Sequence, residues 1–306
     1  MTPTARATTR RAWLRVFAAG LVLWLLTVVV TFLTGNPNLV PTLVLLGSFL
    51  VPVTFVVWAY GRRDTGEISV ELLFRTFITG GVLGVLAASL LEAYLLHPSA
   101  WLFLGVGLIE EGVKLAALAF ITRHLAVKSV RDGMILGAAV GFGFAGFESA
   151  GYAFTALFTV HGLSLMQVVQ TEILRGLLAP VGHGLWTAVL GGVLFSRSTR
   201  DHFAITGRLV LAYLGVSVLH ALWDSMHTIA LIVVLALTGT QAQFDRIANG
   251  WPLEPTPQQV QLFTTVQWTG LAVVAIVGVG WLVGLWHTAP RWRDPHTYWR
   301  IPAGRA

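Results

Sequence analysis

The 306-residue chain contains no cysteine and few charged residues. The absence of cysteine excludes disulfides, thiolate catalysis, iron–sulfur clusters and cysteine zinc sites. Only 11% of the residues are charged, whereas soluble globular domains carry about 25%. Hydrophobic residues make up 55% of the chain and gather in long runs. Several of these runs are long enough to cross ~30 Å of hydrocarbon as a helix. The sequence therefore indicates an integral membrane protein.

The apolar runs predict an all-α fold, a polytopic transmembrane helical bundle with about eight spans. The expected ranges are 14–34, 40–60, 71–96, 100–122, 133–157, 167–195, 209–237 and 262–286. The sixth and seventh spans are long, so we expect tilt or a break in them, and Pro180 removes a backbone donor within the sixth. No soluble domain is visible, and residues 1–306 are predicted to form one integral membrane domain.

The basic residues give the expected orientation of the bundle. With the N-terminus in the cytoplasm and alternating loops, sixteen of the 20 lysines and arginines fall in cytoplasmic segments. Only Arg246 falls in an outside loop, and Arg75, Lys114 and Arg175 lie within spans. This asymmetry follows the positive-inside rule and predicts that both termini are cytoplasmic. We therefore expect the basic clusters to meet the lipid bilayer, and we expect no nucleic-acid partner.

The fourth span carries charges where a membrane helix should be apolar. Charged side chains at membrane depth cost several kcal/mol by insertion scales, so they usually face a protein interior. Glu110, Glu111 and Lys114 lie in the middle of this span. Spacings of four and three residues bring both glutamates within reach of the lysine. An internal ion pair would explain one glutamate and not the second, so we interpret the group as functional.

The next three spans carry further polar residues. The fifth has Glu148 after a run of glycines that would let a neighbouring helix approach closely. The sixth has His183 between two glycines, and the seventh has His220 and Asp224 four residues apart on one helical face. Each of these features, taken alone, is also compatible with a packing role. Glu172 and Arg175, nearer the outer end of the sixth span, are interpreted as a pair or as snorkelling side chains.

The depths of these polar groups agree with one another. At ~1.5 Å of rise per residue, Glu110, Glu148, His183 and His220 all fall in the central part of a ~30 Å hydrocarbon core. A single buried polar site is the simpler interpretation, because chance would scatter them. Four ionised carboxylates against one lysine would leave a net negative charge that cannot persist at low dielectric. Either some carboxylates stay protonated or a cation binds.

Both of these options suit hydrolysis. Two histidines and a carboxylate can hold zinc and leave a position open for water, so His183, His220 and Glu148 are candidate ligands of a divalent metal. The usual helix motif of zinc proteases, H-E-x-x-H, is absent from the chain. A carboxylate can also serve as general base without a metal. The residues alone leave the two alternatives open.

The four motifs, in this order, resemble the PrsW family of intramembrane proteases, a relative of the CAAX prenyl endopeptidases and the bacteriocin-immunity group. That group has a paired glutamate followed by a basic residue, then an aromatic-led motif and histidine motifs, each on its own transmembrane helix. Here the glutamate pair precedes Lys114, and Phe144 stands four residues before Glu148. His183 and His220 supply the histidine motifs.

The resemblance covers about residues 100–230 and implies a catalytic four-helix core at 100–237. It implies an intramembrane endopeptidase of a bacterial plasma membrane that cleaves membrane-anchored proteins, for example anti-sigma factors in site-one cleavage. One glutamate, with Glu110 favoured, would activate water while Lys114 holds the other. The histidines would ligate zinc or stabilise the oxyanion. The expected catalytic set is Glu110, Glu111, Lys114, Glu148, His183, His220 and Asp224. In this set Glu148 and Asp224 would orient the histidines.

Two other classes of protein are compatible with polar groups at the bilayer midplane. One is an ion- or proton-coupled transporter, in which the carboxylates form a relay. No pair of matched repeats is visible in the sequence, which argues against this class. The other is a catalytically silent scaffold of the same fold, and the full set of candidate catalytic groups argues against that.

Overall fold

The computed structural model describes residues 12–290, which fold into helices and one short hairpin. Their order along the chain is α2 (Ala12–Thr34), η1 (Pro37–Leu39), α3 (Val40–Tyr60), α4 (Val70–Leu95), α5 (Leu102–Thr122), α6 (Val130–Ala156), β1 (Phe158–Thr159), β2 (Gly162–Leu163), α7 (Leu165–Leu178), η2 (Ala179–Val181), α8 (His183–Phe195), α9 (Gly207–Thr238), α10 (Gln241–Ala248) and α11 (Pro257–Thr288).

Seven helical stretches in this part of the chain are long and apolar enough to cross a membrane, so the prediction of an all-α polytopic membrane protein is confirmed. The remaining expected span is α5. Its 21 residues would extend about 31 Å as a helix. Three charged residues lie close together in the middle of this helix, and all three are buried inside the protein. The total of eight spans and the cytoplasmic termini remain predictions.

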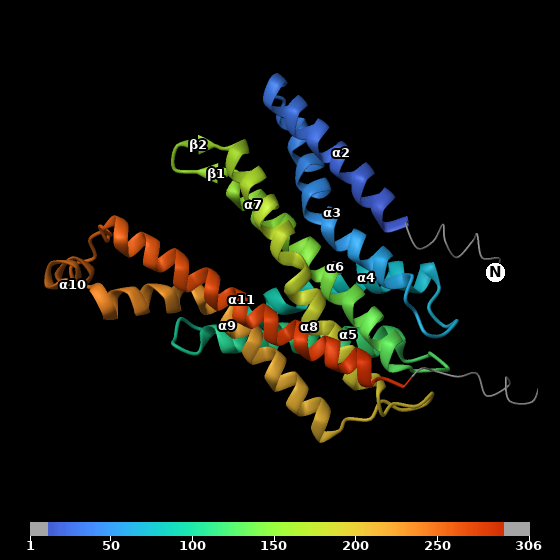
Figure 1. The fold of residues 1–306 in the computed structure, drawn as a ribbon. Helices are drawn as coiled ribbons and strands as arrows, with labels where there is room; N and C mark the ends of the chain where they lie inside the picture. Colours follow the sequence, from blue (N-terminus) through green and yellow to red (C-terminus); the bar gives the residue numbers. More distant parts are fainter. Residues whose placement is uncertain (1–11, 291–306) are drawn as a thin grey trace, which may run out of the picture.

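The connections between helices alternate between two ends of the bundle. The α2–α3 turn, the β1–β2 hairpin and α10 lie on the upper and left side of Figure 1. The α3–α4 and α8–α9 connections lie on its lower and right side. The second end carries basic residues of the loops, including Arg63, Lys128 and Arg200. This arrangement agrees with the orientation that the charge distribution predicts.

Glycines let α6 pack directly on the backbone of α8. Gly133, Gly137 and Gly141 recur every four residues on one face of α6, as in the small-residue interfaces of membrane helices. A Cβ atom added to Gly137 would lie 2.2 Å from the carbonyl oxygen of Thr187, and one added to Gly141 would lie 2.2 Å from that of His183. The close approach therefore fixes the start of α8 against α6.

The sixth expected span is broken, as its length and Pro180 indicated. The helix α7 ends at Leu178, a 3-10 turn with Pro180 follows, and α8 begins at His183. Proline has no N–H to continue the hydrogen-bond ladder and its ring clashes with the preceding turn. His183 is therefore the first residue of a new helix, α8, and this helix lies in the middle of the bundle (Figure 1).

A Gly137→Ala variant is expected to be less stable than the wild type, because the added Cβ would push α6 and α8 apart. Overpacking of this kind costs about 1–3 kcal/mol. The melting temperature of the purified protein in detergent measures the effect. The matched control is Gly151→Ala in the same helix, where nothing lies within 4 Å of an added Cβ. Equal melting temperatures for the two variants would contradict the close contact.

Candidate active site

The centre of the site is the ammonium group of Lys114, which is fully buried in α5. Its Nζ donates to Glu111 Oε1 at 2.7 Å and to Glu110 Oε2 at 3.0 Å. Its third contact is Nδ1 of His183 in α8, at 2.9 Å. The ring of Phe144 lies 4.1 Å from Nζ and adds a cation–π contact. An ammonium has three donors and no acceptor. Nδ1 of His183 therefore accepts the hydrogen bond from Lys114, and the proton of the neutral imidazole ring lies on Nε2.

His220 approaches the same carboxylates from α9. Its Nδ1 lies 3.0 Å from Glu111 Oε1, and its Nε2 lies 3.2 Å from Asp224 Oδ2. The ring is 1% exposed, and Nε2 is 3.7 Å from Glu110 Oε2. Both ring nitrogens therefore face carboxylates. The spacing of four residues places Asp224 one turn from His220 on the same helix face, as the sequence predicted.

Glu148 holds the other side of His183. Its Oε2 lies 3.0 Å from Nε2 of that ring and pairs with the guanidinium of Arg175. The Nε of Arg175 also donates to Ser149 Oγ at 2.7 Å. The interpretation of Arg175 as a partner of Glu172 is therefore wrong. Glu172 instead accepts a hydrogen bond from the indole of Trp24 at 2.8 Å, because it lies on the α2–α3 side of α7.

Aromatic side chains pack around the imidazoles of the site. The indole of Trp186 lies against both imidazoles, with ring centroids 5.5 Å from His183 and 4.7 Å from His220. The two histidine rings are 5.0 Å apart, and Phe144 lies 5.2 Å from His183. These rings fix the orientation of the imidazoles by packing. They also keep water away from the ion pairs of Lys114, which strengthens them.

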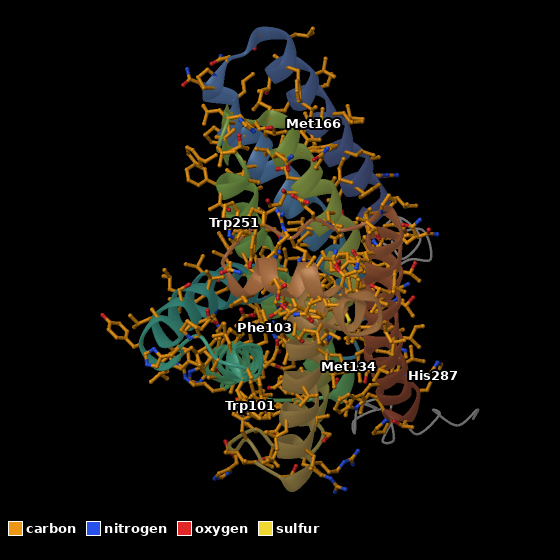
Figure 2. The ribbon with its side chains drawn as sticks, turned by 90° about the vertical axis from the view of Figure 1, so that its left-hand side faces the viewer. Trp101, Phe103, Met134, Met166, Trp251 and His287 are labelled. Carbon is orange, nitrogen blue, oxygen red and sulfur yellow. The ribbon has the colours of Figure 1, made fainter. Side chains whose placement is uncertain are left out.

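A cavity of about 460 Å³ opens on the other side of the polar cluster. Glu110, Glu148, His183 and Asp224 line it, whereas Glu111, Lys114 and His220 lie behind its wall. Phe103 at the start of α5 also lines it and is labelled near the middle of Figure 2. The cluster therefore has an accessible part that a bound chain could reach and a hidden part that only supports it.

The comparisons with known proteins agree with this arrangement. Residues 69–244 match the family described as PrsW family intramembrane metalloprotease. The chain belongs to this family. A protein named Protease PrsW from Halalkalibacterium halodurans is 25% identical over 189 residues, which are 60% of this chain and 82% of the relative. Another Protease PrsW, from Shouchella clausii, is 29% identical over 140 residues, 44% of this chain and 60% of the relative. No solved structure matches the chain.

The family resemblance read from the motifs is thus confirmed, and the chain is a multi-pass bacterial membrane protein of the PrsW family. All seven residues of the expected catalytic set meet in one network through contacts of 2.7–3.7 Å. Their individual roles stay predictions. The structure adds Arg175 and Glu92, which also line the cavity. The sequence carried a signal for Arg175, since a cation within a span needs a partner.

The donor set fits a divalent metal, with one change from the expected ligands. Glu110, His183 and His220 each offer a ligand atom, and the three atoms lie within 4.8 Å of one another. Two histidines and a carboxylate also bind the zinc ion in several hydrolytic enzymes of other families. Glu148, the carboxylate expected from the sequence, is not part of the group found among residues 12–290, because it is held by Arg175 on the far side of His183.

An Arg175→Gln variant is expected to lower the melting temperature, because Glu148 would then be left without its cation. Breaking a buried pair costs up to 3–5 kcal/mol, and the partial exposure of this one reduces the expected loss to about 2 kcal/mol. The double variant with Glu148→Gln should recover most of the loss. Arg246→Gln, which breaks the exposed pair with Glu254, is the control and should change little. A loss of stability that is additive in the double variant would contradict the pairing.

Proposed function

We propose that this PrsW-family chain is an intramembrane endopeptidase in which Glu110 activates the attacking water. The observation that carries this assignment is the difference between the two adjacent glutamates. Glu110 lines the cavity and lies 3.7 Å from a ring nitrogen of each of His183 and His220. Glu111 is fully buried and is already bound to Lys114 and His220. Of these two adjacent glutamates, Glu110 is the one that lines the cavity and can reach a water beside a substrate.

The proposed reaction is a hydrolysis in two steps. A water in the cavity gives a proton to the Glu110 carboxylate while its oxygen attacks the carbonyl carbon of the scissile peptide. The carbonyl electrons move onto the oxygen and form a tetrahedral oxyanion. The C–N bond then breaks, and the proton held by Glu110 passes to the leaving nitrogen. The products are a new carboxyl end and a new amine end.

His183 is the proposed donor to the oxyanion, since it is the histidine that lines the cavity. The contact of Lys114 with Nδ1 keeps the proton on Nε2, which is the nitrogen that faces Glu148 and the cavity side. In this arrangement the Nε2 proton is directed at Glu148, so donation to the oxyanion requires His183 to exchange that hydrogen bond for one to the substrate. Glu148 and Asp224 are proposed to orient the two imidazoles, as their contacts of 3.0 and 3.2 Å with His183 and His220 support.

In a metal-dependent form, Glu110, His183 and His220 would hold the ion. The metal would supply a polarised water and a Lewis acid. In the described arrangement, however, Lys114 lies on both Glu110 and Nδ1 of His183, and Asp224 lies on Nε2 of His220. A cation at this position would compete with the ammonium of Lys114 for the same ligand atoms. This competition favours Glu110 as a base over Glu110 as a ligand.

The proposed substrates are membrane-anchored proteins, and the family resemblance points to anti-sigma factors as a class. A peptide bond within a helix is shielded by its neighbours, so the segment to be cut must enter the cavity in an extended form. The volume of about 460 Å³ is in the range of sites that enclose a small ligand, and it would admit a few residues of an unwound chain.

A Glu110→Gln variant is expected to lose cleavage of a single-span reporter protein in proteoliposomes by at least ~100-fold, the usual contribution of a general base. Its melting temperature should fall less than that of Glu111→Gln, because Lys114 loses one carboxylate partner but keeps the shorter contact with Glu111. Glu111→Gln should lower both the rate of reporter cleavage and the melting temperature, because it leaves Lys114 and His220 without their buried partner. Glu71→Gln at the exposed start of α4 is the control. Full activity in Glu110→Gln would rule out the proposed base.

Removal of metal ions tests the choice between the two mechanisms. We expect the purified enzyme to retain reporter cleavage after dialysis against a strong chelator, because Lys114 occupies the ligand atoms that a metal would need. We also expect less than one zinc per chain by elemental analysis. One zinc per chain, lost together with activity on chelation and restored by added zinc, would overturn this expectation and make Glu110 a ligand.

A further inference from the structure

The charged residues that line the cavity differ in whether they have a partner. Glu110 is bound to Lys114, Glu148 to Arg175, and Asp224 to His220. Glu92 enters the same cavity from α4, outside the four-helix core. Its Oε1 is buried and accepts no hydrogen bond from any residue of the described range 12–290. Among the charged lining residues in that range, Glu92 is thus the one whose side chain is left without a partner.

Such an unpaired carboxylate is costly and calls for an explanation. A buried polar atom without a hydrogen bond loses its interaction with water and gains nothing in exchange. A glutamine or an apolar side chain would fill the same position at lower cost. No described residue reaches this oxygen, so it is satisfied either by water or by a polar group of a molecule that enters the cavity. The reacting chain is the molecule that enters there if the proposed function is correct.

The charge of the lining indicates which kind of group that is. Four carboxylates, including Glu92, line the cavity against the single guanidinium of Arg175. The lining is therefore negative when these groups are ionised, and it stays negative if one divalent ion binds. A lysine or arginine side chain offers both the donors and the positive charge that Glu92 lacks.

The position of Glu92 relative to Glu110 indicates how far the residue bound by Glu92 lies from the scissile bond of the substrate. The helices α4 and α5 pack against each other and are joined by residues 96–101. Glu92 lies three residues before the end of α4, and Glu110 lies eight residues after the start of α5. Glu92 is therefore about 8 Å nearer to this connection, at 1.5 Å of rise per residue. An extended chain covers that distance in two to three residues.

We propose that Glu92 is a specificity residue that binds a lysine or arginine of the substrate two to three residues from the scissile bond, on the side of the α4–α5 connection. This inference rests on the proposed function, since it names a subsite of the same cavity. Glu92 takes no part in the bond-breaking step. Its contact with the substrate determines which peptide bond of an unwound segment is held beside Glu110.

The test uses the full-length protein in proteoliposomes and a set of single-span reporters. Lysine, glutamine or glutamate is introduced at each position within four residues of the mapped cleavage site. With the wild type, kcat/KM should be about tenfold higher for lysine than for glutamine at one position on the expected side, with glutamate the poorest. Glu92→Gln should remove this preference, so that the ratio of kcat/KM for the lysine reporter to that for the glutamine reporter falls to about one. Glu92→Lys should invert the preference toward glutamate.

Three results would overturn the assignment. A lysine preference that persists in Glu92→Gln would mean that another group reads the charge. No preference at any position in the wild type would mean that the cavity does not select a cation. A melting temperature that falls in Glu92→Gln would indicate a structural role, whereas the proposal expects it to stay the same or rise. Failure of the wild type to cleave any reporter would instead contradict the proposed function itself, and the subsite would fall with it.

Discussion

The arrangement of the site depends on one buried cation. The ammonium of Lys114 sits where no water can solvate it, and its three donors are used on two carboxylates and one imidazole. Burial of an ammonium costs several kcal/mol, and only well-placed partners offset that cost. The lysine therefore requires Glu110, Glu111 and His183 to be where they are. Through these contacts α5 is tied to α8, and through Glu111 it is tied to His220 of α9.

The packing of the bundle serves this same requirement. His183 reaches Lys114 only because α8 lies against the glycine face of α6, at Gly133, Gly137 and Gly141. The break at Pro180 then frees the first residue of α8 to turn toward the site. The aromatic rings of Trp186 and Phe144 fill the space around the imidazoles. Small residues, a proline and two aromatic side chains thus act together to hold charged groups in an apolar bundle.

Much of the fold and of the site could be predicted from the sequence, because the helical repeat fixes which side chains are neighbours along one helix. The pairing of Lys114 with both glutamates and of His220 with Asp224 follows from spacings of three and four residues. The common depth of the groups follows from their position within each span. The all-helical class and the break in the sixth span follow from composition and from Pro180.

The parts that could not be predicted all depend on how the helices are rotated and how far apart they lie. Glu148 is paired with Arg175, because α7 turns that arginine inward while Glu172 turns toward Trp24. Glu110 joins the two histidines as a candidate ligand because α5 packs against both α8 and α9. Glu92 belongs to no motif, and only the packing of α4 beside α5 brings it to the cavity. Spacing within one helix carries no information on any of these contacts.

The same geometry explains why two adjacent glutamates are present in the first motif. Successive residues of a helix point about 100° apart, so two neighbours can reach one lysine four and three positions later while facing different surroundings. Glu111 turns into the protein and keeps Lys114 and His220 in place. Glu110 contacts the same lysine but also lines the cavity. In the proposed mechanism Glu111 therefore keeps Lys114 neutralised while Glu110 takes the proton of the water. The pair divides these two demands between its members, and the division requires no residue outside one turn of α5.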